Sequence, residues 1–343
     1  MLDLTPAGGL VPTDGPVDWT QLDKLPYCRT VEWSGPDRGI VEAVGAHPGI
    51  RFLYWSEAAG DLDLRATRLG TVRLEGAALG SVRLPSSIDT VLLRRPPANL
   101  RVEAPDDGAR LELRLFQYGP DVVIPSGLHR TPKVWLWVGG AVSAGVLTPL
   151  SGLAQLTLTF DAGPGAITDL SDLRQHHGLH TLQLDDAYGL EPDVLPDLPQ
   201  LRQLVLNGTR RSTATALRRR YRPGPVELSV NGAKSEAWLA AYLDNPFRDW
   251  VEDSRAFGEA ACKAYLRAWR AVEAIDPEAP DAPAAGERAL RTLVADLNTI
   301  DARYGLIDTL YRDQVGDVFL ALAERLRIPE ALANRWFDND RRF

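Results

Sequence analysis

Leucines recur through the middle of the chain in a spaced pattern that itself repeats. The motif L-x-x-L-x-L occurs at residues 153–158, 179–184 and 201–206, and weaker versions occur at residues 131–136 and 223–228. The middle positions of the five motifs (134, 156, 182, 204 and 226) are separated by 22, 26, 22 and 22 residues. A period of roughly 20–29 residues predicts coils of chain that stack on one another and share a leucine-filled interior.

Between residues 50 and 125, short strand-like runs arrive about every ten residues, which is too short for one coil. Taking alternate runs restores a coil-sized period. One set is anchored at Leu53, Val72, Val91, Leu111 and Val134, and the intervening set at Leu64, Leu84, Val102 and Ile124. This spacing predicts that the early coils have a strand on both sides. After residue 140, apolar residues spaced by three predict short 3₁₀-like segments on the second side.

Over residues 131–231, and more weakly over 50–125, this pattern resembles the leucine-rich repeat family. The resemblance implies an α/β solenoid with a parallel β-sheet on its concave face, which the family uses to bind other proteins. The asparagine position of the family motif is occupied only by Asn231, with Gly139, Asp161, Ala187 and Thr209 in the other coils. The expected fold is therefore an irregular leucine-rich repeat solenoid, of a bacterial type that carries a helical tail.

The repeat period stops after residue 232, and helical spacing replaces it. Apolar residues three and four apart predict helices over 235–275, broken at Asn245-Pro246, then around 290–300 and over 306–327. The sequence thus predicts a flexible arm at 1–20, a solenoid with an N-terminal cap at 21–232, and an all-α domain at 233–343. A Pro- and Ala-rich linker is expected at 276–286.

Charge and cysteine content narrow the class of protein. The net charge is −8 and the pI is about 5.3, which disfavours a nucleic-acid binder. Cys28 and Cys262 form no C-x-x-C pair, which argues against a disulfide framework or a structural zinc site and favours a reducing cytoplasm. Neither a signal segment nor an apolar run of ~18 residues is recognisable, so we expect a cytoplasmic protein without membrane contact.

Alternation along the strands predicts which residues the concave face presents. In the middle coils these are five cations and two tryptophans: Arg73, Arg94, Arg110, Arg114, Lys133, Trp135 and Trp137. Arginine binds carboxylate in a bidentate manner, and tryptophan and arginine dominate interface hot spots. The patch therefore predicts binding of an acidic or aromatic segment of another protein or peptide. The alternative is that the tryptophans pack under a loop or the arm.

The function favoured by the sequence is non-catalytic protein binding, without a cofactor. The alternative from another class is an enzyme, or an accessory subunit, with a pocket for an anionic small molecule between the solenoid and the helical domain. Phosphate-loop, dinucleotide, hydrolase-elbow and H-E-x-x-H motifs are absent from the sequence. His176, His177 and His180 are candidate metal ligands, although their position at the entry to a strand favours solvated turn histidines.

Overall fold

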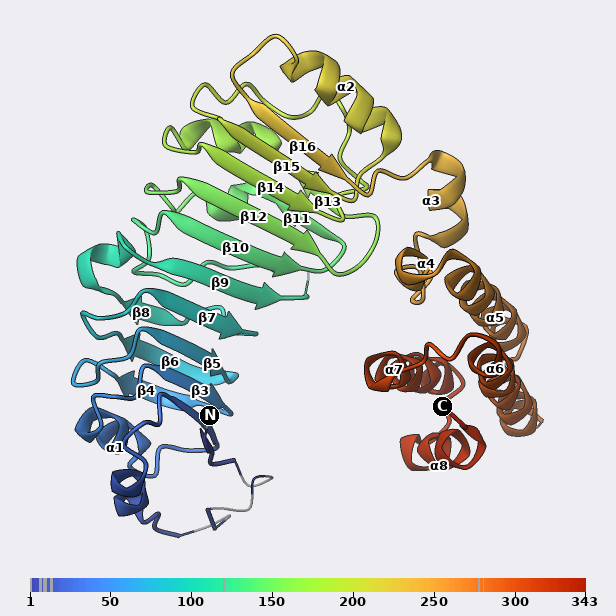
Figure 1. Ribbon diagram of the computed structural model, residues 1–343, viewed down its shortest axis with the longest axis horizontal. Coiled ribbons are helices and arrows are strands. Elements are labelled where there is room, and N and C mark those ends of the chain that lie inside the picture. The colour runs from blue at the N-terminus through green and yellow to red at the C-terminus, as the bar shows by residue number, and fades with distance from the viewer. Residues whose placement is uncertain are drawn as a thin grey trace. The chain divides into compact units, whose positions relative to one another are not determined.

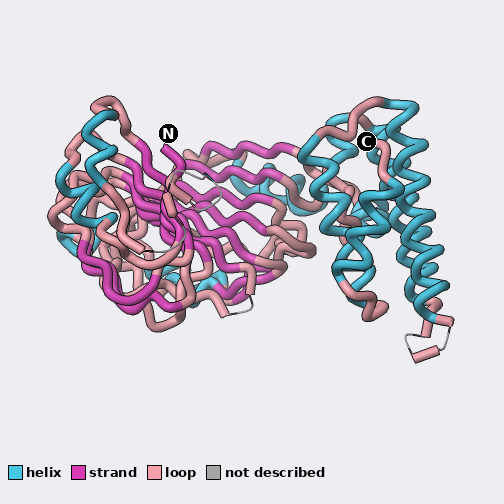
Figure 2. Tube along the Cα trace, turned by 90° about the horizontal axis from the view of Figure 1, so that it is seen from below, coloured by secondary structure: helices cyan, strands magenta, loops and turns pink. Residues whose placement is uncertain are grey.

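The computed structural model describes residues 2–5, 8, 11–12, 15–119, 121–276, 278–279 and 281–343. The chain divides into two compact units, Met1–Glu236 and Ala237–Phe343. All the described strands lie in the first unit, and the second is helical (Figures 1 and 2).

An eleven-stranded sheet runs through the first unit, and every neighbouring pair of its strands is parallel. From β2 onward each strand pairs residue for residue with the next, without a register shift, so the sheet grows by one strand per repeat (Figure 1). In sheet order the strands are β1 (Leu2–Asp3), β2 (Thr30–Ser34), β3 (Phe52–Ser56), β5 (Thr71–Glu75), β7 (Thr90–Arg94), β9 (Glu112–Gln117), β10 (Lys133–Val138), β12 (Gln155–Phe160), β14 (Thr181–Asp185), β15 (Gln203–Asn207) and β16 (Glu227–Asn231).

Shorter elements accompany the large sheet. A three-stranded parallel sheet consists of β4 (Ala59–Asp63), β6 (Ala78–Arg83) and β8 (Arg101–Glu103), and a two-stranded one of β11 (Ala141–Ser143) and β13 (Ala166–Thr168). The second strands expected in the early coils are thus present, except that residues 122–124 form none. The helices are η2 (Trp19–Lys24), α1 (Ile40–Ala46), η3 (Pro105–Gly108), η4 (Ala144–Leu147), η5 (Leu170–Gln175) and α2 (Arg211–Tyr221), where η marks 3₁₀ helices.

Burial alternates along the strands, because successive side chains of a strand point to opposite faces of the sheet. In β12, Leu156 and Leu158 are at most 1% exposed, whereas Thr157 between them is half-buried. Leu156 pairs with Val134 on one side and Leu182 on the other, so these positions form one continuous core. The segments that follow neighbouring strands approach closely: a β-carbon at Gly76 would overlap the carbonyl oxygen of Ala58.

Described residues of the amino-terminal region form regular elements that the sequence does not predict. Residues 1–20 are expected to be a loose arm, yet β1 pairs with β2 at the edge of the large sheet. Trp19 begins a 3₁₀ helix, and its ring packs 5.3 Å from that of Trp33. The start of the segment 21–232, where the sequence predicts an N-terminal cap, contains β2 and α1. Residues 1, 6, 7, 9, 10, 13 and 14 of the expected arm lie outside the described residues.

The second unit is a set of helices around its own core of buried aromatic and aliphatic residues. They are α3 (Glu236–Tyr242), α4 (Trp250–Asp253), α5 (Arg255–Glu273), α6 (Ala282–Tyr304), α7 (Thr309–Arg325) and α8 (Glu330–Asp340). Gly305 ends α6 in the left-handed conformation that glycine favours, and Asp308 caps α7 by accepting a hydrogen bond from the backbone amide of Tyr311.

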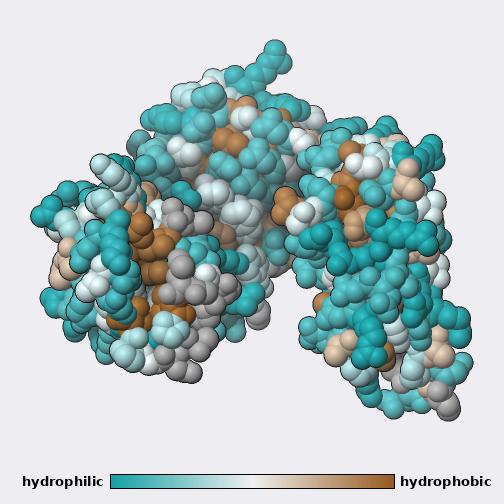
Figure 3. Space-filling view, turned by 60° about the horizontal axis from the view of Figure 1, so that its bottom comes forward, coloured by the Kyte–Doolittle hydropathy of each residue, from teal (hydrophilic) through white to brown (hydrophobic). Residues whose placement is uncertain are grey.

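The linker expected at 276–286 is shorter than predicted, because α6 already begins at Ala282. Pro283 lies in the first turn of that helix. Backbone N–H groups in the first turn have no acceptor within the helix, so a proline, which has no N–H, is compatible with helix there. In the space-filling view of Figure 3 the surface of the helical unit is mainly hydrophilic, with small apolar areas. Among the described helices, none has the length and apolar character needed to cross a bilayer.

The alternating burial predicts opposite effects for two adjacent substitutions in β12. Leu158→Ala should lower the free energy of unfolding by about 2–5 kcal/mol, because it leaves a cavity in the continuous core. Thr157→Ala, on the other face, should cost less than about 1 kcal/mol. Urea unfolding followed by circular dichroism measures both, and equal losses would contradict the assignment of the two faces.

The two cysteines should differ sharply in reactivity. Cys262 in α5 is fully buried, and burial raises the pKa of its thiol to about 12, so at pH 8 only about one thiol in ten thousand is ionised. Cys28 is half-buried. We expect iodoacetamide to label Cys28 in the native protein and Cys262 only after denaturation. Labelling of Cys262 in a native Cys28→Ser variant would contradict this packing of the helical unit.

Candidate functional site

The face of the large sheet opposite its core carries three side chains per strand, and we call it the open face. In β5 these are Thr71, Arg73 and Glu75, all half-buried. Because the strands pair in register, open-face residues line up in rows that run across the sheet. Neighbours in a row are one strand apart, ~4.8 Å. The middle row, from β2 to β12, reads Glu32, Tyr54, Arg73, Leu92, Arg114, Trp135 and Thr157.

Three arginines of the open face each lie over an aromatic ring of a neighbouring strand. Each pair joins direct register partners, and the Cζ atoms lie 6.0, 5.8 and 5.3 Å from the ring centres in the pairs Arg73–Tyr54, Arg94–Phe116 and Arg114–Trp135. Such cation–π contacts are worth about 0.5–1 kcal/mol at exposed sites. They hold each guanidinium group against a ring and limit the freedom of its flexible stem.

The aromatic side chains of β9 and β10 also stack on one another. The ring of Trp137 lies 5.1 Å from that of Phe116 and 5.2 Å from that of Trp135, with interplanar angles of 17° and 20°. All three are half-buried, so they are neither sealed in the core nor fully solvated. We call these three rings, Tyr54 and the arginines at positions 73, 94 and 114 the cationic–aromatic patch.

Carboxylates of the open face compensate part of the positive charge. Glu112 accepts a hydrogen bond from Nε of Arg114 at 2.6 Å, and Glu75 lies 3.8 Å from Nε of Arg94. Arg73 and Lys133 have no ion pair with any described residue. Within β5, β7, β9 and β10 the open face thus carries four cations and two carboxylates.

The structure brings together all the residues predicted for the face except Arg110. That side chain is 83% exposed, in a turn before β9, where it lies 3.6 Å from Asp106. The prediction that Arg110 belongs to this face is wrong, because β9 begins at Glu112 and not at Arg110. The same displacement makes Leu113, not Leu111, the register partner of Val91. It also adds Phe116, which the sequence reasoning missed, to the patch.

A row of polar side chains continues from the patch toward β16. Thr159 accepts a hydrogen bond from the indole of Trp135 at 3.0 Å and donates one to Asp185 at 3.0 Å. Asp185 also accepts from Asn207 at 2.8 Å and from Gln183 at 3.0 Å. Neutral donors therefore surround this carboxylate, and the row fixes the orientation of the Trp135 ring.

The three candidate metal ligands do not converge. His176 is 4% exposed, its Nδ1 lies 3.0 Å from the carbonyl oxygen of Leu150, and its Nε2 has no partner among the described residues. His177 is exposed, and Nδ1 of His180 lies 3.0 Å from the hydroxyl of its neighbour Thr181. In the described part of the chain, no three His, Cys, Asp or Glu side chains gather as a metal site would require.

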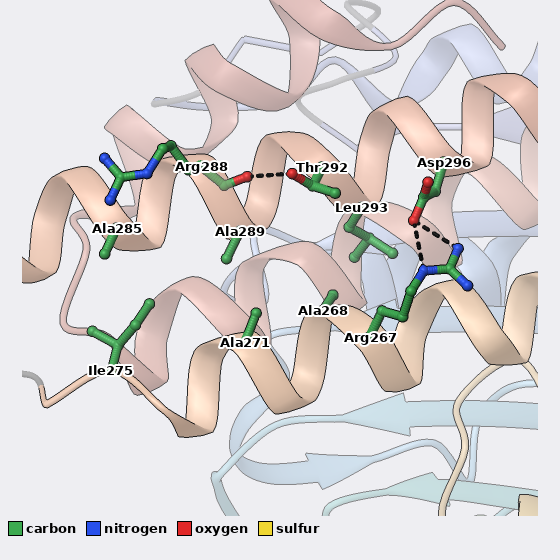
Figure 4. Close-up of a pocket in the computed structure, with 10 residues that line it drawn as sticks. All are labelled: Arg267, Ala268, Ala271, Ile275, Ala285, Arg288, Ala289, Thr292, Leu293 and Asp296. Carbon is green, nitrogen blue, oxygen red and sulfur yellow. Dashed lines mark hydrogen bonds and ion pairs between the residues drawn. The ribbon is translucent and has the colours of Figure 1, made fainter.

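The helical unit contains a groove of about 300 Å³ between α5 and α6, lined by four alanines, two larger apolar residues and four polar ones (Figure 4). Three of its four polar side chains bond within the unit: Arg267 donates to Asp296 at 2.8 Å, and Thr292 donates to the carbonyl oxygen of Arg288 at 2.7 Å. The groove therefore lacks the converging free polar groups that orient a small-molecule substrate.

No protein-family model and no curated protein sequence matches this chain.

Burial lowers the pKa of His176 from its ordinary value of 6.5, against the opposing effect of the Leu150 carbonyl. Below about pH 6.5 the unfolded chain then binds more protons than the folded one, so stability falls as the pH falls through this range. His176→Gln should flatten the decrease in melting temperature between pH 7 and pH 5, and replacement of the exposed His177 by Gln is the matched control. An unchanged slope in the His176 variant would contradict the buried, neutral imidazole.

Proposed function

We propose that the first unit is an irregular leucine-rich repeat solenoid that binds another protein, without catalysis, through its open face. The repeat spacing and the in-register parallel sheet support the solenoid. The observation that favours binding is the alignment of three arginines with three aromatic register partners on one exposed sheet face. Arg94, Arg114, Trp135 and Trp137 form the proposed centre, with an acidic or aromatic segment as the partner.

The physical argument rests on preorganisation. A partner that binds flexible side chains must order them at a cost of about 0.5–1.5 kcal/mol for each one. Here Arg114 is held by Trp135 and Glu112, and Trp135 is held by Thr159, so part of that ordering is complete before binding. Half-buried aromatic rings add apolar contact area, which strengthens interfaces at their centre.

The proposed location is a reducing compartment such as the cytoplasm. The two cysteines are free in the structure and lie in different units. A reducing environment keeps such thiols unpaired.

Affinity capture from an extract of the native cells tests the proposal. The wild-type chain should retain at least one protein that a Trp135→Ala/Trp137→Ala variant loses, and an Arg94→Gln/Arg114→Gln variant should lose it as well. Glutamine avoids placing two carboxylates beside Glu75 and Glu112. The retained protein is then purified, and its affinity for each variant is measured directly.

The control is Gln203→Ala, an exposed open-face position on β15 outside the patch. It should bind like the wild type. All variants should remain folded with a cooperative unfolding transition, because the changed side chains lie outside the core. Equal recovery of every protein by the wild type and both patch variants would refute the proposed binding face.

A further inference from the structure

The geometry of the patch decides which part of each arginine remains available to a ligand. In the three cross-strand pairs the Cζ atom of the guanidinium group lies 5.3–6.0 Å from the centre of an aromatic ring, so the ring occupies one side of the group. The N–H groups lie along the edge of the guanidinium plane. An edge of this kind matches the two oxygens of a carboxylate. The arrangement therefore favours carboxylate binding over the stacking of a further ring on the arginine.

The protein itself shows this preference at two of the three arginines. Nε of Arg114 donates to Glu112, and Nε of Arg94 lies near Glu75, while both guanidinium groups stay over their rings. Internal carboxylates thus occupy the positions at which a ligand carboxylate would bind. Both glutamates are only partly buried, with 31% and 34% of their side chains exposed, so an incoming group can replace them.

The aromatic stack is less suited to a partner ring. Phe116 and Trp135 each stack on Trp137. The guanidinium groups of Arg94 and Arg114 lie over Phe116 and Trp135, respectively. Ring edges carry partial positive charge, which attracts oxygen atoms. Beyond β12 the open face carries Asp185 and Glu227 and no cation, so anionic groups are favoured only over β5 to β10.

We infer that the segment recognised by the patch is rich in carboxylates, and that Glu75 and Glu112 act as internal competitors that weaken its binding. This inference rests on the proposed function and chooses the acidic alternative within it. The ligand carboxylates bind the edges of Arg94 and Arg114, and the internal glutamates turn away into solvent. Arg73 and Lys133, which have no ion pair within the described residues, supply the further positive charge.

The test uses synthetic peptides of eight glutamates, eight glutamines or eight lysines with blocked ends, and the full chain at about 0.1 M salt. Binding is followed by fluorescence of the tryptophans. The octaglutamate should bind the wild type, and Glu75→Gln/Glu112→Gln should bind it about two- to thirtyfold more tightly, the range expected for removing two partly exposed ion pairs. Arg73→Gln/Arg94→Gln/Arg114→Gln should abolish binding.

The matched control is Glu191→Gln/Glu227→Gln, which changes the net charge equally at two exposed positions away from the arginines. Glu227 lies five strands from Arg114, well beyond the screening length of ~10 Å at 0.1 M salt. This variant should bind octaglutamate as the wild type does. An equal gain in both double variants would indicate a general charge effect and would overturn the role of Glu75 and Glu112.

The outcomes separate this inference from the proposed function. If the partner captured from extract requires the patch but octaglutamate neither binds nor competes, protein binding stands and the acidic specificity fails. Tighter binding of the octalysine, weakened by Glu75→Gln/Glu112→Gln, would show that the glutamates bind a basic partner instead. Loss of both patch-dependent capture and peptide binding would refute the function as well as its specificity.

Discussion

In-register parallel pairing of strands that return once per repeat is the constraint on which the first unit depends. It places each residue beside its counterpart in the next repeat, one strand away, so any property of a position recurs along a row. On the core side, Leu156 and Leu182 are register partners, and both side chains are fully buried against each other and the rest of the core. On the open face the same constraint would set like charges ~5 Å apart.

On the open face this repulsion is reduced because cations alternate with uncharged or acidic residues along each row. The cations of β5, β7 and β9 sit in rows next to aromatic residues, leucine or glutamate instead of next to one another. Leu92 separates Arg73 from Arg114 in the middle row, and Glu75 is the register partner of Arg94. Beyond β12 hydrogen bonds replace charge pairing, with Asp185 accepting from neutral donors. The two arrangements meet at the indole of Trp135, which stacks on one side and donates to Thr159 on the other.

The repeat spacing predicted the inner rows and most of the patch from sequence alone, because leucine periodicity reflects burial directly. The spacing gave the wrong start for β9, because a turn precedes that strand. Pro105–Gly108 form a 3₁₀ helix, followed by the turn at Arg110, and β9 therefore starts two residues later than its apolar pattern suggests. Because side chains alternate between the faces of a strand, a shift of the strand start by two residues leaves each side chain on the same face. Arg114 is therefore on the open face as predicted, whereas Arg110 lies before the strand and Phe116 belongs to the patch. The stacking of the rings is a three-dimensional property that no spacing in the sequence encodes.

The internal carboxylates connect the stability of this surface with its binding. Without them, the arginines and Lys133 would repel one another across neighbouring strands, and a free surface of this charge would attract any anion. Under the proposed function, a ligand carboxylate that replaces a glutamate gains only the difference between the two ion pairs, so several carboxylates are needed for an appreciable affinity. Glu75 and Glu112 lie on different strands, so the positions they occupy are spaced across the sheet. The proposed specificity is therefore for a segment with several spaced carboxylates over an isolated anion.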